Sequence, residues 1–330
     1  MIKKQYSISC IRFISLLLIV SCHIMQYYDF VLAWWFNVGV DVFLCISGFL
    51  YGSRTINDIP SFINRRLRKI LVPYYITFFT VVLFQYAFVS EQIDLNLVLG
   101  GIVLRTLLMG GEHLWFVPVI LICYAILIIL DRYKEKYVDS MKSFILFFFI
   151  VIISSLIIFD GCFSFYKTDC IICFIIGYCL GLNDEKKYIS RKCFLGVILF
   201  FALIGNGIQI YLGPIKKIKI PQNMETAARL LIAYNHVFLG ITIFILLKEM
   251  LDKVSFRPSV LRFLNKTDEY SYETYLVHQF VILGPFSLLN ITPYFFVNLV
   301  IVISVVVILA FLLRFIEGFI IPLKHKEIAK

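Results

Sequence analysis

Apolar runs of about 20 residues recur along this chain and constrain its fold more than any other feature. A helix that crosses the hydrocarbon core of a bilayer needs about 20 consecutive, largely apolar residues. Hydrophobic residues make up 61% of the chain, whereas soluble domains contain roughly 45–50%. A soluble fold has too little interior for this surface, which excludes a soluble enzyme, a disordered chain, a disulfide scaffold and a collagen-like fibre. The sequence therefore predicts an all-α, polytopic integral membrane protein.

The runs predict about ten transmembrane helices in one bundle, at residues 8–27, 33–52, 70–89, 114–130, 143–159, 170–182, 193–212, 230–247, 271–290 and 294–313. A half-apolar stretch at 93–110 contains Asp94 and Arg105, so we interpret it as an interfacial or re-entrant segment. The sequence shows no long linker, low-complexity tract or internal repeat. We therefore expect residues 1–330 to form a single transmembrane domain.

The positions of the Lys and Arg residues predict how the chain is oriented. Of 31 such residues, 24 lie on segments that share a side with the N-terminus, six lie on the other side, and Arg12 lies inside the first run. Cytoplasmic loops of membrane proteins carry this excess. We expect both termini in the cytoplasm and the chain in the inner (plasma) membrane. The net charge of +10 is explained by this orientation, so no nucleic-acid partner is expected.

Two ionisable residues of the first run, Arg12 and His23, lie 11 residues apart. Such residues cost about 2.5–3.5 kcal/mol each inside a membrane span, so each needs a physical reason. At 100° per residue their spacing is only about 20° past three full turns, which places both side chains on one helix face. They are about 16 Å apart along the axis, whereas a structural pair is expected at i+3 or i+4. This face suits an extended anionic molecule lying across the membrane.

The second run contains Asp41 and is expected to pack against the first. A buried carboxylate can orient a nearby histidine or neutralise a nearby cation. The sequence leaves open whether Asp41 serves His23 or Arg12. We interpret two further polar residues of apolar runs, His236 and Glu273, as interhelical contacts.

A basic run, Asn64-Arg65-Arg66-Leu67-Arg68-Lys69, comes immediately before the third span. It orients the chain, but four cations in five residues exceed what orientation needs. A guanidinium group binds two phosphate oxygens at once, so Arg65, Arg66 and Arg68 are candidate ligands of a cytosolic phosphate compound. Anionic lipid headgroups are the alternative ligand.

The fourth span is preceded by Glu112-His113-Leu114-Trp115 on the expected outer side. Tryptophan is common at the membrane interface, and beside polar groups it can also stack on a sugar ring. We found no phosphate-binding glycine loop, GxSxG elbow or HExxH motif. No ligand cluster indicates a metal, so none is expected.

Five short segments, taken together, resemble the acyltransferase-3 family of polytopic membrane acyltransferases. They are the Arg-x10-His pattern of Arg12 and His23, Gly39–Leu50 (similar to GVDxFFxxSGF), the basic run followed by Pro73, His113–Phe116 (similar to HLWF) and Ser271–His278 (similar to SxGIYLIH). They occur in the family's order, and the predicted helix count equals the family's usual ten. Glu273 departs from the pattern, since the family often has glycine there.

The resemblance implies a membrane O-acyltransferase, most often one that moves an acetyl group from cytosolic acetyl-CoA to a carbohydrate hydroxyl. The acceptor would be a surface polysaccharide or its lipid-linked precursor, in contact with membrane lipids. Arg12, Arg65, Arg66 and Arg68 are then expected to bind the anionic donor.

The resemblance and the helix face together assign further roles. His23 is the expected general base, Asp41 and Arg12 its catalytic partners, and His113, Trp115 and His278 the expected substrate-binding residues. A covalent acyl-histidine step stays open. The alternative function is export or flipping of a polysaccharide or lipid-linked glycan, although transporters usually show paired repeats and broken helices. A structural subunit of a glycan-assembly complex would leave the Arg12 and His23 face unexplained.

Overall fold

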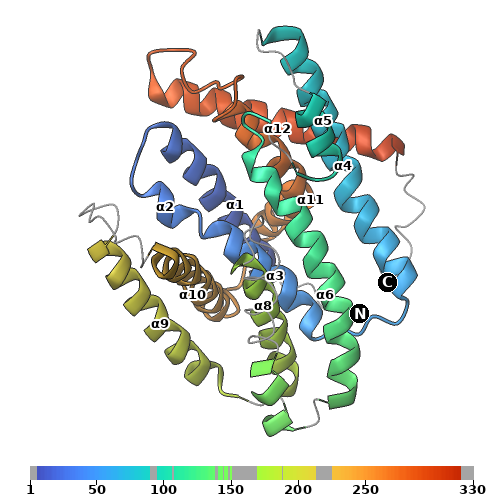
Figure 1. Cartoon of the computed structure of the whole chain (residues 1–330), viewed down its shortest axis with the longest axis vertical. Coiled ribbons are helices and arrows are strands. Elements are labelled where there is room, and N and C mark those ends of the chain that lie inside the picture. The colour runs from blue at the N-terminus through green and yellow to red at the C-terminus, as the bar shows by residue number, and fades with distance from the viewer. Residues whose placement is uncertain are drawn as a thin grey trace.

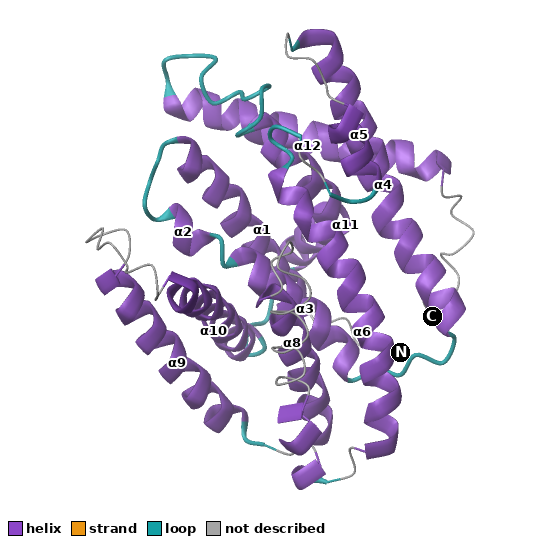
Figure 2. Cartoon of the chain, viewed as in Figure 1, coloured by secondary structure: helices purple, strands orange, loops and turns teal. Residues whose placement is uncertain are grey.

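The computed structural model describes residues 6–89, 95–105, 108–137, 140–143, 145–147, 149–150, 169–187, 189–212 and 225–320. Throughout these residues the regular structure is helical (Figure 2). Seven helices in the described part are long and apolar enough to cross a membrane. The predicted all-α, polytopic membrane fold is therefore confirmed, while the total of about ten spans stays a prediction.

Most predicted spans are helices at the expected places. They are α1 (Tyr6–Tyr27), α2 with α3 (Ala33–Phe36 and Gly39–Gly52), α4 (Ile59–Phe88), α6 (Phe116–Tyr137), α8 (Asp169–Lys186), α9 (Arg191–Leu212), α10 (Glu225–Leu251) and α12 (Phe295–Ile320). The predicted span at 143–159 lies largely outside the described residues.

The predicted span at 271–290 is wrong. Helix α11 instead runs from Pro258 to His278, the 3₁₀ helix η3 follows at Gln279–Val281, and loops and turns then lead to α12. The prediction used apolar composition, which continues past the helix end, whereas Gly284 and Pro285 are poor helix formers. As a result, His278 lies at the end of a helix and not inside a span.

The half-apolar stretch at 93–110 forms α5 (Leu95–Ile102), which is about 12 Å long and too short to span a bilayer. It packs against α4, where the hydroxyls of Tyr74 and Tyr75 donate to the carbonyl oxygens of Gly101 (2.8 Å) and Ile102 (2.9 Å). These bonds explain how a short helix is held without crossing the membrane.

Helix α4 has 30 residues and is therefore about 45 Å long, which exceeds a hydrocarbon core of about 30 Å. It begins after Asp58, whose carboxylate caps the helix by accepting a hydrogen bond from the Ser61 N–H (3.1 Å). The basic run thus lies in the first turns of the helix that also forms the third span.

Helix α3 lies in the core, where it packs against α1, α8 and α10 (Figure 1). Its closest neighbour is α8, and the two helices meet through glycines. A Cβ atom placed on Gly48 would lie 1.9 Å from the Phe174 carbonyl oxygen, and one on Gly177 would lie 2.2 Å from the Cys45 carbonyl oxygen. Small residues allow helix backbones to approach this closely in a membrane.

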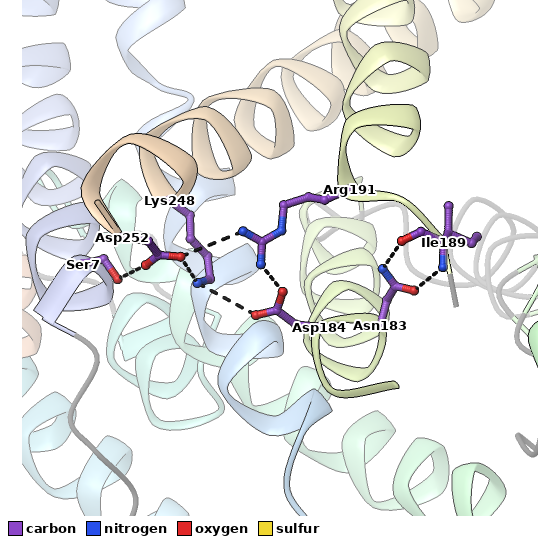
Figure 3. Close-up of polar contacts among 7 residues, drawn as sticks. All are labelled: Ser7, Asn183, Asp184, Ile189, Arg191, Lys248 and Asp252. Carbon is purple, nitrogen blue, oxygen red and sulfur yellow. Dashed lines mark hydrogen bonds and ion pairs between the residues drawn. The ribbon is translucent and has the colours of Figure 1, made fainter. Parts of the chain in front are cut away.

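Charged residues at one end of the bundle connect four helices (Figure 3). Asp252 accepts hydrogen bonds from Ser7 of α1 (2.6 Å) and Lys248 of α10 (2.7 Å). Arg191 of α9 pairs with Asp184 of α8, and Lys248 lies 3.9 Å from the same carboxylate. Because Lys248 is only 4% exposed, this network fixes α10 against its neighbours.

Candidate active site

Three imidazoles from distant parts of the sequence lie together. His23 belongs to α1, His113 to the 3₁₀ helix η1 (Glu112–Trp115), and His278 to the end of α11. The ring centroids lie 5.1 Å apart for His23 and His278, 5.0 Å for His113 and His278, and 6.4 Å for His23 and His113. His113 and His278 are buried, and His23 is half-buried. We call this group the histidine cluster; it unites the predicted base with two predicted substrate-binding residues.

Hydrogen bonds fix the tautomer of each ring in the cluster. The three donor and acceptor pairs are His23 Nδ1 to Gln26 Oε1 (2.7 Å), His113 Nε2 to the Leu276 carbonyl (3.1 Å) and His278 Nδ1 to the Tyr275 carbonyl (2.6 Å). Because these oxygens only accept, the other nitrogen of each neutral ring carries a lone pair. Within the described residues, His113 Nδ1 and His278 Nε2 have no hydrogen-bond partner. The cluster is therefore rich in hydrogen-bond acceptors.

The segment before α6 is held against the end of α11. Gln279 donates from Nε2 to the Glu112 carboxylate (2.6 Å), which also accepts from the Gly110 N–H (3.2 Å). The Tyr275 hydroxyl donates to the His113 carbonyl. These contacts position His113 beside His278 although the two lie far apart in the sequence.

A cavity with about 790 Å³ of empty space, including the part open to solvent, lies between α1, α3, α4, α6 and α11. Four cationic side chains line it: Arg12, Arg54, Arg66 and Lys69. The lining carboxylate is Asp268 of α11, which forms an ion pair with Arg12 and accepts a hydrogen bond from Ser9 (3.4 Å). This excess of positive charge suits a ligand with several negative charges.

Arg66 is surrounded by aromatic rings. Its guanidinium carbon lies 5.1 Å from the ring centroid of Tyr51, 5.6 Å from that of Phe62 and 5.2 Å from that of Tyr124. Cation–π attraction to these rings holds the side chain at the cavity wall. Arg66 is therefore placed before any ligand arrives.

The cavity and the histidine cluster are neighbours. Phe116 lines the cavity, and its ring centroid lies 5.0 Å from that of Tyr275. The Tyr275 ring in turn lies 5.3 Å from His113 and 5.6 Å from His278. On α1, Arg12 lines the cavity and His23 belongs to the cluster. The predicted common face of α1 thus connects a cation-lined cavity with a group of bases.

Only part of the basic run on α4 lines the cavity. Arg66 and Lys69 line the cavity, whereas Arg65 and Arg68 are exposed and do not line it. Arg65 donates to the Ser61 hydroxyl one turn earlier. Sequence order alone could not show which of these residues line the cavity.

The remaining predicted site residues are Asp41, Arg12 and Trp115. Asp41 is buried in α3, where it accepts a hydrogen bond from Cys173 Sγ of α8 (3.4 Å). Its role toward His23 stays a prediction, and the ion-pair partner of Arg12 is Asp268. Trp115 is half-buried, with its ring centroid 6.5 Å from that of Phe116.

Two predicted interhelical contacts are confirmed. His236 of α10 lies against Trp34 of α2, with 3.8 Å between ring centroids. Glu273 of α11 accepts a hydrogen bond from Arg314 of α12 (3.0 Å). Both explain polar groups in apolar surroundings without a catalytic role.

Sequence reasoning missed Arg54, Asp268 and Gln26. Gln26 follows His23 by three residues, a spacing that places two side chains on one helix face and was a usable signal. Arg54 lies two residues past the end of the second apolar run. Asp268 carries no such signal, because 256 positions separate it from Arg12.

No group of three or more His, Cys, Asp or Glu side chains in the described ranges is arranged to hold a metal ion. The expectation that no metal takes part stays a prediction.

The fold and the site define a class of protein: a polytopic, all-α membrane protein with a cation-lined cavity beside a histidine cluster. Comparison with known families matches residues 5–315 to the acyltransferase-3 family, described as an acyltransferase domain. The chain therefore belongs to the acyltransferase-3 family and is an acyltransferase enzyme of the membrane. Comparisons with curated proteins and with solved structures gave no match.

Proposed function

We propose that this acyltransferase moves an acetyl group from cytosolic acetyl-CoA to a hydroxyl of a surface polysaccharide or of its lipid-linked precursor. The observation that carries the proposal is the shared face of α1, which has Arg12 in the cation-lined cavity and His23 in the histidine cluster. An anionic thioester bound in the cavity would extend its acyl end toward a general base.

The donor is held by charge. CoA carries several phosphate charges, and Arg12, Arg54, Arg66 and Lys69 supply cations around one cavity. Arg65 and Arg68 of the same helix are exposed and attract the donor to the cavity entrance. With both termini in the cytoplasm, this entrance faces the pool of acyl-CoA.

The transfer needs a base at the acceptor hydroxyl. His23 donates from Nδ1 to Gln26, so its Nε2 lone pair can take the hydroxyl proton. The acceptor oxygen attacks the thioester carbonyl, the carbon–sulfur bond breaks, and CoA leaves as a thiolate that takes up a proton. His113, Trp115 and His278 bind the acceptor, and Asp41 supports the positive charge on His23 from α3.

Removal of the base tests the proposal. His23→Ala and His23→Gln should lower acetyl transfer about 10²–10⁴-fold, because an amide can form a hydrogen bond but cannot take the proton. Binding of acetyl-CoA should persist in both variants. The assay is acetylation of glycan by isolated membranes, with expression matched by immunoblot.

His236→Gln is the matched control, because His236 is also a buried membrane histidine but lies against Trp34. Its turnover should stay close to that of the unmodified protein. Near-normal turnover in His23→Ala would refute the general base, and an equal loss in His236→Gln would place the chemistry elsewhere.

A further inference from the structure

The histidine cluster contains more hydrogen-bond acceptors than donors. His113 Nδ1 and His278 Nε2 have no partner among the described residues, and the two side chains are 3% and 0% exposed. Buried polar groups without partners destabilise a protein, so such groups usually serve a ligand or water. In both rings the other nitrogen, Nε2 of His113 and Nδ1 of His278, already donates its N–H to a backbone carbonyl, so the nitrogens without partners need a donor.

We propose that the acceptor presents two hydroxyls on neighbouring carbons of one sugar, one to His23 and the other to His278. This inference rests on the proposed function and narrows its substrate class to a vicinal diol. The ring centroids of His23 and His278 lie 5.1 Å apart, which is short enough for hydroxyls of one sugar ring to reach both. His23 removes the proton of the reacting hydroxyl, while His278 Nε2 accepts a hydrogen bond from its neighbour.

His278 is thus a positioning residue, and it selects the acceptor. A site built to bind a hydroxyl rejects an analogue that lacks it, because the buried acceptor is then left unpaired. Because His278 is fully buried, the acceptor reaches it only when covering side chains move apart, and the half-buried His23 marks the side of entry.

The test uses purified full-length protein in lipid nanodiscs with radiolabelled acetyl-CoA. The probes are the methyl glycosides of glucose, galactose and mannose, each compared with its monodeoxy derivatives. In the unmodified protein, loss of the hydroxyl beside the acetylated one should lower kcat/KM at least tenfold. In His278→Ala the intact glycoside should become as poor as the deoxy one, so the discrimination disappears.

Two controls separate selection from structural damage. His278→Asn keeps a hydrogen-bond acceptor and should retain part of the discrimination, and His236→Ala should leave it unchanged. Acetyl-CoA binding and the thermal unfolding midpoint report whether each variant is folded.

The outcomes distinguish this inference from the proposed function. Equal discrimination in the unmodified protein and in His278→Ala overturns the diol inference, while acetyl transfer itself stands. Acetylation of the cell's own glycan but of none of the diol glycosides also overturns it. Activity lost with a chelator and restored by zinc overturns it too, because a metal would then take the lone pairs. If no carbohydrate of any kind is acetylated, the proposed function fails first.

Discussion

Replacing Gly48 with alanine should separate α3 from α8. The added Cβ would lie 1.9 Å from the Phe174 carbonyl oxygen and 2.8 Å from the Tyr178 nitrogen, whereas real Cβ atoms essentially never come closer than 3.0 Å. The helices must therefore move apart by at least 1.1 Å, the difference between 3.0 and 1.9 Å. Both close atoms belong to the backbone, so a side-chain rotation cannot relieve the contact.

The magnitude follows from two opposing effects. Overpacking costs about 1–3 kcal/mol, and a clash with backbone belongs at the upper end of that range. Alanine offsets up to about 1 kcal/mol through its better helix propensity. We expect Gly48→Ala to lower the free energy of unfolding by about 2 kcal/mol.

Thermal unfolding in detergent measures this loss with a thiol-reactive dye, because Cys45, Cys123, Cys173 and Cys179 are free and buried. The control is Gly207→Ala on α9, where an added Cβ meets nothing within 4 Å. Gly207→Ala should be neutral or stabilising, and Gly48→Ala should unfold several degrees lower. Coincident unfolding midpoints for the two variants would refute the close approach of α3 and α8.

Three further predictions concern the donor, acidity and orientation. Arg66→Ala should raise the KM for acetyl-CoA about 10–100-fold, since a charge-assisted contact contributes about 1.5–3 kcal/mol, and Arg65→Ala should raise it less. Burial raises the pKa of Asp252, but hydrogen bonds from Lys248 and Ser7 and the nearby cations outweigh it and hold that pKa below its ordinary value. The stabilisation by Asp252 is therefore present above the ordinary carboxyl pKa and is lost as the pH falls through the folded-state pKa, so unfolding midpoints measured against pH should lose this acid sensitivity in Asp252→Asn. Reporter fusions at the C-terminus and between α9 and α10 should report opposite sides of the membrane.

The long apolar helices could be predicted because their composition is sufficient evidence. α1 and α12 are apolar over more than the length of a bilayer core, and no soluble structure competes with a span there. α11 could not be predicted this way, because its first half is polar and its apolar sequence continues past its end. Its bounds depend on Gly284 and Pro285 and on packing against α1 and α12.

The candidate site was predictable in part for a similar reason. The spacing of Arg12 and His23 is local information, and helical geometry converts it into a common face. The meeting of His23 with His113 and His278 depends on the tertiary arrangement of three separate elements. The pairing of Arg12 with Asp268 likewise depends on how α1 and α11 pack.

Helix α11 ends inside the histidine cluster, and this ending has an electrostatic consequence. The last carbonyl groups of a helix have no partner within it and form the negative pole of its dipole. Tyr275 and Leu276 provide such carbonyls, which accept the N–H groups of His278 and His113. When a proton enters the cluster, the new positive charge faces the negative end of a 21-residue helix. The backbone itself then supplies part of the counter-charge, in buried surroundings where a further ionised side chain would be costly.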